Sequence, residues 1–140
     1  MLIYGVISYV IGIAGLSCII FAVATWIPFG FLHPDASAFP LLWNLILVAV
    51  WGVIQSVMAR HQFKRLITKF IPRSAQRSTY VAVAGITSIL LIGLWRDLPG
   101  FLWSVTDPLV VNVIWTVFWF GWGYLLASSF AINHFDLFGL

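Results

Sequence analysis

Four long apolar runs divide the chain, and the short segments between them hold most of its polar residues. The runs cover about residues 2–26, 41–58, 80–95 and 109–130. A helix of roughly 20 apolar residues crosses about 30 Å of hydrocarbon, so each run is close to the length of a membrane span. The pattern predicts an all-α fold, a polytopic transmembrane helical bundle of about four antiparallel spans that forms a single membrane domain over residues 1–140.

Composition supports this prediction. Hydrophobic residues make up 62% of the 140 and charged residues only 8%, whereas about a quarter of the residues in a soluble domain are charged. Such a chain has too little polar surface to cover a globule in water, but a bilayer accepts apolar side chains on the outside of a helix. The expected partner is the lipid bilayer. A net charge of +3, on cations expected to lie against a membrane, argues against a nucleic acid.

Six of the seven Lys and Arg residues fall between the second and third runs: Arg60, Lys64, Arg65, Lys69, Arg73 and Arg77. The positive-inside rule makes this basic loop, residues 59–78, cytoplasmic, and it places the N-terminus on the same side. We expect an integral protein of the bacterial inner membrane. Within the loop, apolar residues at steps of three, one and three predict an interfacial amphipathic helix from Gln62 to Ile71.

Small and polar residues inside the runs indicate how the helices pack. A stripe of small residues in the first run predicts close packing against another helix: Gly5, Ser8, Gly12 and Gly15. In the second run, Asn44 and Gln55 lie about three turns apart, on one face. The fourth run has a similar face: Asn112, Thr116, Trp119 and Gly123. Because unpaired amides are costly in hydrocarbon, both faces are predicted to point into the bundle. Ser78 is predicted to be a helix N-cap.

Two groups of residues offer chemistry. His134 and Asp136 follow the last run, and a histidine beside a carboxylate can act as a general base, although solvation of the membrane interface would also explain them. Arg60, Arg73 or Arg77 could hold the anionic group of a ligand, or simply lie on anionic lipid. The three histidines offer too few convergent ligands for a metal site, and none is predicted. A haem or quinone carrier that uses His61 and His134 remains an alternative.

Three stretches carry a resemblance to a known family: QSVMARHQFKRLITKFIP, RSTYVAVAGITSILLIGLW and SSFAINHFDLFGL. In this order and spacing they resemble the nurim-like (NnrU-like) membrane proteins, and most closely the methanethiol S-methyltransferase branch. The resemblance implies methyl transfer to methanethiol, giving dimethyl sulfide, with S-adenosyl-L-methionine as the cofactor. It extends to the N-terminal part of such proteins, so we expect the chain to be the N-terminal part of a longer one.

The resemblance also implies roles for single residues. His134 would be the catalytic base and Asp136 would orient it. The cofactor would be held by Arg60, Arg77, Tyr80 and Asn133, and the small thiol would lie beside Gln55 and Trp119. Related sequences commonly carry His where this chain has Gln55, which cannot serve as a base. A non-catalytic nurim-like membrane protein, or an inactive truncated fragment, therefore remains an alternative.

Overall fold

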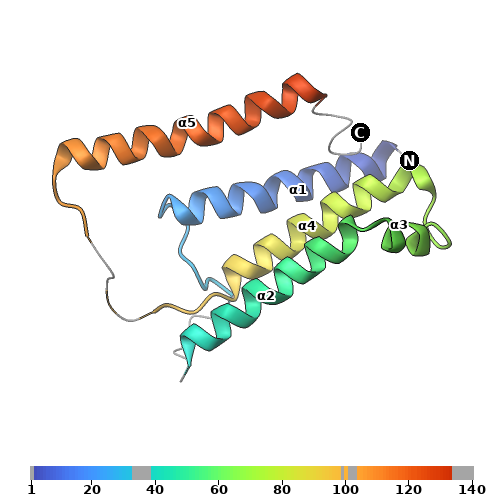
Figure 1. The fold of residues 1–140 in the computed structure, drawn as a ribbon, viewed down its shortest axis with the longest axis horizontal. Helices are drawn as coiled ribbons and strands as arrows, with labels where there is room; N and C mark the ends of the chain where they lie inside the picture. Colours follow the sequence, from blue (N-terminus) through green and yellow to red (C-terminus); the bar gives the residue numbers. More distant parts are fainter. Residues whose placement is uncertain (1, 33–38, 99, 101–103, 134–140) are drawn as a thin grey trace. The chain divides into compact units, whose positions relative to one another are not determined.

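A computed structural model describes residues 2–32, 39–98, 100 and 104–133 (Figure 1). Its elements are α1 (Leu2–Val23), α2 (Pro40–Ala59), α3 (His61–Ile67), the 3-10 helix η1 (Arg73–Ala75), α4 (Gln76–Gly93) and α5 (Pro108–Ile132). The predicted all-α fold is confirmed. The chain divides into two compact units: the first contains α1 to α4 and the second contains α5.

Three helices are long and apolar enough to cross a membrane by length and composition: α1, α2 and α5. They coincide with the first, second and fourth predicted spans. The third predicted span, residues 80–95, overlaps α4, which starts four residues earlier with a polar first turn, Gln76 to Thr79, and ends two residues earlier, at Gly93. The N-cap of α4 is Ala75, so the prediction of a cap at Ser78 is wrong; that serine is buried in the first turn of the helix.

The end of α1 is set by a Schellman motif. Thr25 has a left-handed backbone with φ of 63°. The Trp26 N–H donates to the Phe21 carbonyl at 2.8 Å, and the Thr25 N–H donates to the Ala22 carbonyl at 3.0 Å. The Phe21 and Trp26 rings stack with centroids 5.4 Å apart, which is the apolar contact that usually accompanies this motif. The helix therefore stops at Val23, three residues before the predicted end at Trp26.

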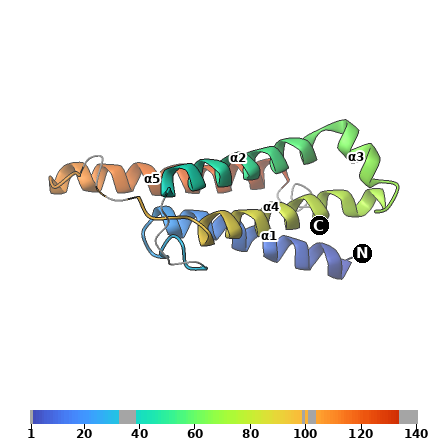
Figure 2. The same ribbon diagram turned by 90° about the horizontal axis from the view of Figure 1, so that it is seen from below.

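In the first unit α4 lies alongside both α1 and α2, as Figures 1 and 2 show from two directions. Within this unit α2 runs antiparallel to α4, as predicted: Asn44 near the start of α2 bonds to Arg96 just beyond the end of α4. Helices α1 and α4 run in the same direction. Tyr4 bonds to Thr79 near their starts, and Cys18 and Ala22 cluster with Ile92 near their ends.

Helices α1 and α4 pack so closely that their backbones are in direct contact. A Cβ atom placed on Gly15 would overlap the backbone of Gly85, and one placed on Gly85 would overlap the carbonyl of Ile11. Ser8 on the same stripe is only 1% exposed. The predicted packing role of the small-residue stripe is confirmed, and its partner is α4.

The α2–α4 contact is made by polar side chains. Asn44 is 3% exposed; its Nδ2 donates to the Arg96 carbonyl at 2.7 Å, and its Oδ1 accepts from the Arg96 N–H at 2.9 Å. Further along, Trp51 Nε1 donates to Ser88 Oγ at 3.2 Å. Gln55 Nε2 donates to Thr87 Oγ1 at 3.1 Å. The prediction that Asn44 and Gln55 share an inward face is confirmed.

The C-terminal end of α4 is covered by the segment that follows α1. A helix leaves its last carbonyls without partners inside the helix. The N–H groups of Gly30 and Leu32 donate to the carbonyls of Ile92 and Gly93, each at 2.9 Å. Gly30 takes φ of 75°, a conformation that glycine adopts at little cost. These bonds hold one end of the first unit together.

Helix α3 is shorter than the predicted helix over residues 62–71. Thr68 Oγ1 bonds back to the carbonyls of Lys64 and Arg65, at 3.2 and 2.7 Å. The Phe70 N–H then donates to the Ile67 carbonyl at 3.0 Å, in a tighter turn than that of an α-helix. The helix ends at Ile67, and residues 68–70 form a turn.

Helix α5 in the second unit has a defined start and end. Asp107 is its N-cap, with Oδ1 accepting from the N–H groups of Leu109 and Val110 at 2.9 and 3.1 Å. Pro108 occupies the first helical position, where its fixed φ suits a helix and its missing N–H removes no helical bond. Asn133 at the C-cap has a left-handed backbone with φ of 112°.

Candidate functional site

The first unit gathers cationic residues at one end, which we call the cationic end: Arg60, Lys64, Arg65, Lys69 and Arg77. Because α2 and α4 run antiparallel, the end of α2 and the start of α4 lie together, with α3 in the connection between them (Figures 1 and 2). All five residues are exposed. The resulting surface can attract an anion.

Arg60 lies where the chain turns from α2 into α3. Its backbone is extended, with φ of −73° and ψ of 142°, so the two helices are not continuous. Its N–H donates to the Val57 carbonyl and its carbonyl accepts from the Lys64 N–H, both at 3.1 Å. The start of α4 is tied to the same connection, since Gln76 Nε2 donates to the Lys64 carbonyl at 2.7 Å. Arg60 and Arg77 thus project from one assembled region.

Tyr80 is half-buried in the first turns of α4, on the same end as Arg77. The neighbouring Thr79 pairs its hydroxyl with that of Tyr4 at 2.8 Å, which brings the start of α1 to this end as well. Three of the four residues predicted to bind the cofactor thus belong to the same end of the first unit: Arg60, Arg77 and Tyr80. The fourth, Asn133, belongs to the second unit, where it ends α5.

Gln55, predicted to lie beside the thiol substrate, takes part in helix packing. It is half-buried and donates to Thr87, whose hydroxyl donates onward to the Val83 carbonyl at 2.8 Å. Trp51, one turn earlier on α2, donates to Ser88. The amide therefore has a structural role whether or not it also contacts a substrate.

Trp119, the second residue predicted at the thiol site, belongs to an aromatic cluster along α5. Its ring stacks on that of Trp115 with centroids 6.4 Å apart and meets Phe118 edge-on at 5.0 Å. Phe118 also contacts Trp122, at 6.3 Å. Such faces can attract a cation or line an apolar cavity.

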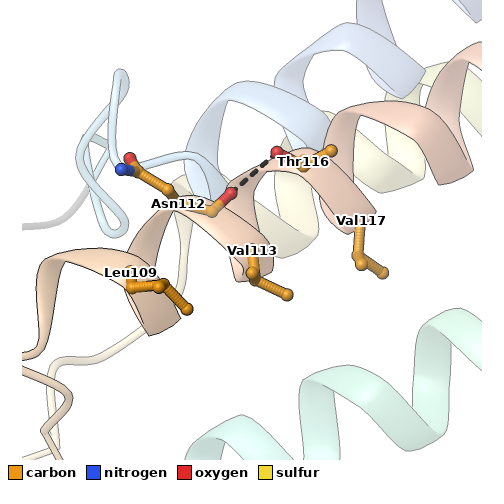
Figure 3. A pocket seen from close by; sticks show the side chains of 5 residues that line it. All are labelled: Leu109, Asn112, Val113, Thr116 and Val117. Atoms are coloured by element: carbon orange, nitrogen blue, oxygen red, sulfur yellow. Dashed lines mark hydrogen bonds between the residues drawn. The ribbon is translucent and has the colours of Figure 1, made fainter.

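An open pocket of about 480 Å³ lies along the first half of α5 and is lined by Leu109, Asn112, Val113, Thr116 and Val117. Figure 3 shows Asn112 and Thr116 leaving one side of the helix and the three apolar side chains leaving another. Thr116 Oγ1 donates to the Asn112 carbonyl at 2.8 Å. Within the second unit Asn112 and Thr116 are exposed, and their inward orientation stays a prediction.

The two predicted catalytic residues, His134 and Asp136, lie outside the described residues. The part of the chain that the structure covers contains no group of three or more His, Cys, Asp or Glu residues placed to hold a metal ion. His61 is exposed at the start of α3.

Several polar partners in the first unit were not identified from the sequence. Thr87, Ser88 and the backbone of Arg96 pair with α2, and Trp43 Nε1 donates to the Leu94 carbonyl at 2.8 Å. The Arg96 guanidinium also lies over the Trp43 ring, 5.7 Å from its centroid. The sequence does contain one signal for these partners. Thr87 and Ser88 place two hydroxyls inside an apolar run, and polar groups in a membrane span usually face another helix.

The described residues define an all-helical protein with three helices long and apolar enough to cross a membrane and with cations gathered at one end of a packed helical unit. The chain is 48% identical over 97 residues to the methanethiol S-methyltransferase of Mycobacterium tuberculosis. It is 45% identical over 97 residues to methanethiol S-methyltransferase 1 of Bradyrhizobium diazoefficiens, and 36% identical over 100 residues to the methanethiol S-methyltransferase of Pseudomonas deceptionensis. The predicted resemblance to methanethiol S-methyltransferases is confirmed.

These matches are partial. They cover 69%, 69% and 71% of this chain, but only 40%, 34% and 38% of the respective relatives. The matched part of the chain therefore spans between about one third and two fifths of the length of these curated proteins. No family model and no solved structure matches it.

Proposed function

We propose that this chain forms part of a membrane S-methyltransferase that moves a methyl group from S-adenosyl-L-methionine to methanethiol, giving dimethyl sulfide. The observation that carries the proposal is the identity of 36% to 48% to relatives that bear this enzyme name. The apolar helices support it, because methanethiol has no charged or amide group and suits an apolar, aromatic-walled site.

The chemistry of the cationic end fits the methyl donor. S-adenosyl-L-methionine supplies a methyl group on a sulfonium sulfur and also carries a carboxylate. Arg60 and Arg77 would hold the carboxylate by charge-assisted hydrogen bonds, with Tyr80 beside them. Asn133 would contribute from the end of α5. The faces of Trp119 and its neighbours would attract the sulfonium. We assign the cationic end to the cytoplasmic side, as the positive-inside rule directs.

The reaction requires a thiolate, because an alkyl thiol is mostly protonated at neutral pH and reacts poorly. In this proposal His134 accepts the thiol proton, and Asp136 orients the imidazole. The thiolate sulfur then forms the new bond to the methyl carbon, and the electron pair of the broken carbon–sulfur bond stays with the departing thioether. Gln55 and Trp119 would lie beside methanethiol and hold it in line.

The test uses membranes that contain the protein expressed from its complete gene, supplied with methanethiol and with donor labelled in the methyl group. Labelled dimethyl sulfide is measured in the headspace. His134→Asn should lower the rate about 100-fold or more, the usual contribution of a general base. Arg77→Gln should raise the KM for the donor, and Gln62→Ala, an exposed change on α3, should leave both parameters unchanged. The absence of labelled product from folded protein would contradict the proposal.

A second candidate is a non-catalytic membrane protein in which the polar residues serve assembly. The bond from Gln55 to Thr87 favours it, because this amide takes part in packing at the position where related sequences commonly carry His. Calorimetric titration with S-adenosyl-L-methionine separates the two candidates. Saturable binding that Arg77→Gln weakens supports the enzyme, whereas heats equal to those of dilution support an assembly role.

A further inference from the structure

The segment from Phe63 to Phe70 presents an apolar edge that the first unit leaves partly uncovered. Phe63 and Ile67 are half-buried, but Leu66 is 55% exposed and Phe70, in the turn after α3, is 83% exposed. The spacing places Phe63, Leu66 and Ile67 on one side of α3, and Phe70 follows in the turn. Neighbouring exposed apolar side chains rimmed by polar residues are typical of a surface that contacts a membrane or another protein.

Cations flank this apolar edge. Lys64, Arg65 and Lys69 are exposed, and at 100° per residue the first two fall outside the arc that holds Phe63, Leu66 and Ile67. No Asp or Glu occurs anywhere from Ala59 to Arg96. The surface that covers α3 must therefore accept apolar side chains in its interior and also carry negative charge at its boundary.

The position of α3 indicates where that surface lies. The helix follows α2 directly, and α2 is long and apolar enough to cross a membrane. The extended backbone of Arg60 turns the chain out of the direction of α2, as Figures 1 and 2 show. The bond from Gln76 to the Lys64 carbonyl then keeps α3 beside the start of α4. A helix held at the end of a span lies at the level of the lipid headgroups.

We propose that α3 and the turn 68–70 dock on the surface of an anionic phospholipid bilayer. Leu66 and Phe70 enter the boundary between headgroups and acyl chains, while Lys64, Arg65 and Lys69 pair with lipid phosphates. The complementarity between these cations and anionic headgroups sets the preference for lipid composition. The proposal goes beyond methyl transfer and does not depend on it.

The test uses the whole protein in lipid nanodiscs, made either of phosphatidylcholine alone or of phosphatidylcholine mixed with anionic phosphatidylglycerol. In a Cys18→Ala background, an environment-sensitive fluorophore is attached to Phe70→Cys, to Leu66→Cys, which retains Phe70, or to Gln62→Cys as the exposed control off the apolar edge. Doxyl-labelled lipids serve as quenchers. Labels at positions 66 and 70 should be blue-shifted and quenched in anionic discs, and the label at position 62 should remain in water.

The charge requirement is tested with Lys64→Gln, Arg65→Gln and Lys69→Gln combined. This variant should lower quenching at position 66 by about twofold or more in anionic discs, because each cation near such a surface contributes separately to binding. Labels at 66 and 70 that stay water-accessible in both lipids would overturn the proposal. Equal quenching with and without anionic lipid, or with and without the three cations, would overturn it as well. Since dimethyl sulfide is not the readout, failure here is distinct from failure of the proposed enzyme.

Discussion

Helix α4 has two packed faces, and they are built in different ways. Toward α1 the contact is between backbones, with Gly15 and Gly85 so close that neither position has room for a Cβ atom. Toward α2 the contact is made by side chains, with Asn44, Trp51 and Gln55 donating hydrogen bonds. Apolar side chains gain little by leaving lipid for another helix, so close packing and hydrogen bonds are the two available means of association. In this protein close backbone packing dominates the α1 face of α4, with one side-chain hydrogen bond between Tyr4 and Thr79 near the helix starts, whereas side-chain hydrogen bonds dominate the α2 face.

The difference predicts unequal tolerance to mutation. A backbone contact fails when one methyl group is added, because the overlapping atoms cannot rotate away. A set of separate hydrogen bonds loses only the bond that is removed. Mutations on the α1 face should therefore cost more stability than those on the α2 face.

The largest effect is expected for Gly85→Ala. The new Cβ would overlap the Ile11 carbonyl and force α1 and α4 apart, so we expect a loss of about 3 kcal/mol in the free energy of unfolding. Gly52→Ala on α2 is the matched control, since nothing lies within 4 Å of its added Cβ and its cost should be near zero. Unfolding by steric trapping in lipid measures both. Equal stability of the two variants would show that the close contact is not needed.

Asn44→Leu should have the next largest effect. It leaves the partly buried N–H and carbonyl of Arg96 without the two bonds that Asn44 makes to them, at a cost of about 2 kcal/mol. Asn112→Leu on α5, where the amide is exposed within its unit, is the comparison. The same unfolding assay applies. A loss at Asn112 as large as that at Asn44 would confirm the prediction that α5 also turns its amide toward another helix.

The bond between Gln55 and Thr87 should contribute least. A double-mutant cycle of Gln55→Leu and Thr87→Val is expected to give a coupling energy of about 0.6 kcal/mol, typical of single hydrogen bonds between membrane helices. The cycle is measured by the same unfolding assay. A coupling energy near zero would mean that the bond adds nothing to the α2 face.

The faces of these helices were predictable, but their partners were not. The small-residue stripe of α1 and the spacing of Asn44 and Gln55 identified which sides of these helices pack. Residues that recur at helical spacing lie on one side of a helix. Periodicity does not specify which helix lies opposite, so the pairing of both faces with α4 came only from the structure. Helix ends were also missed where the chain departs from common signals: Thr25 takes the left-handed position that is usually glycine, and Thr68 ends α3 through its hydroxyl.

For the candidate site, the charge pattern and the alternating direction of the helices were enough to place Arg60 and Arg77 at the same end, whereas the role of Tyr80 beside them came only from the family resemblance. The packing role of Gln55 could not be expected from the sequence, because it depends on Thr87 lying opposite. His134 and Asp136 lie outside the described residues, and their catalytic roles stay a prediction.

The parallel arrangement of α1 and α4 is central to this account. It brings the start of α1 to the cationic end, and it places Gly15 of α1 opposite Gly85 of α4. Cross-linking in native membranes tests it most directly, in a Cys18→Ala background with a short thiol-reactive linker. Tyr4→Cys paired with Thr79→Cys should cross-link efficiently, since these two side chains meet at 2.8 Å. Tyr4→Cys paired with Trp95→Cys, at the other end of α4, should not cross-link. Preferential cross-linking of positions 4 and 95 would contradict the account.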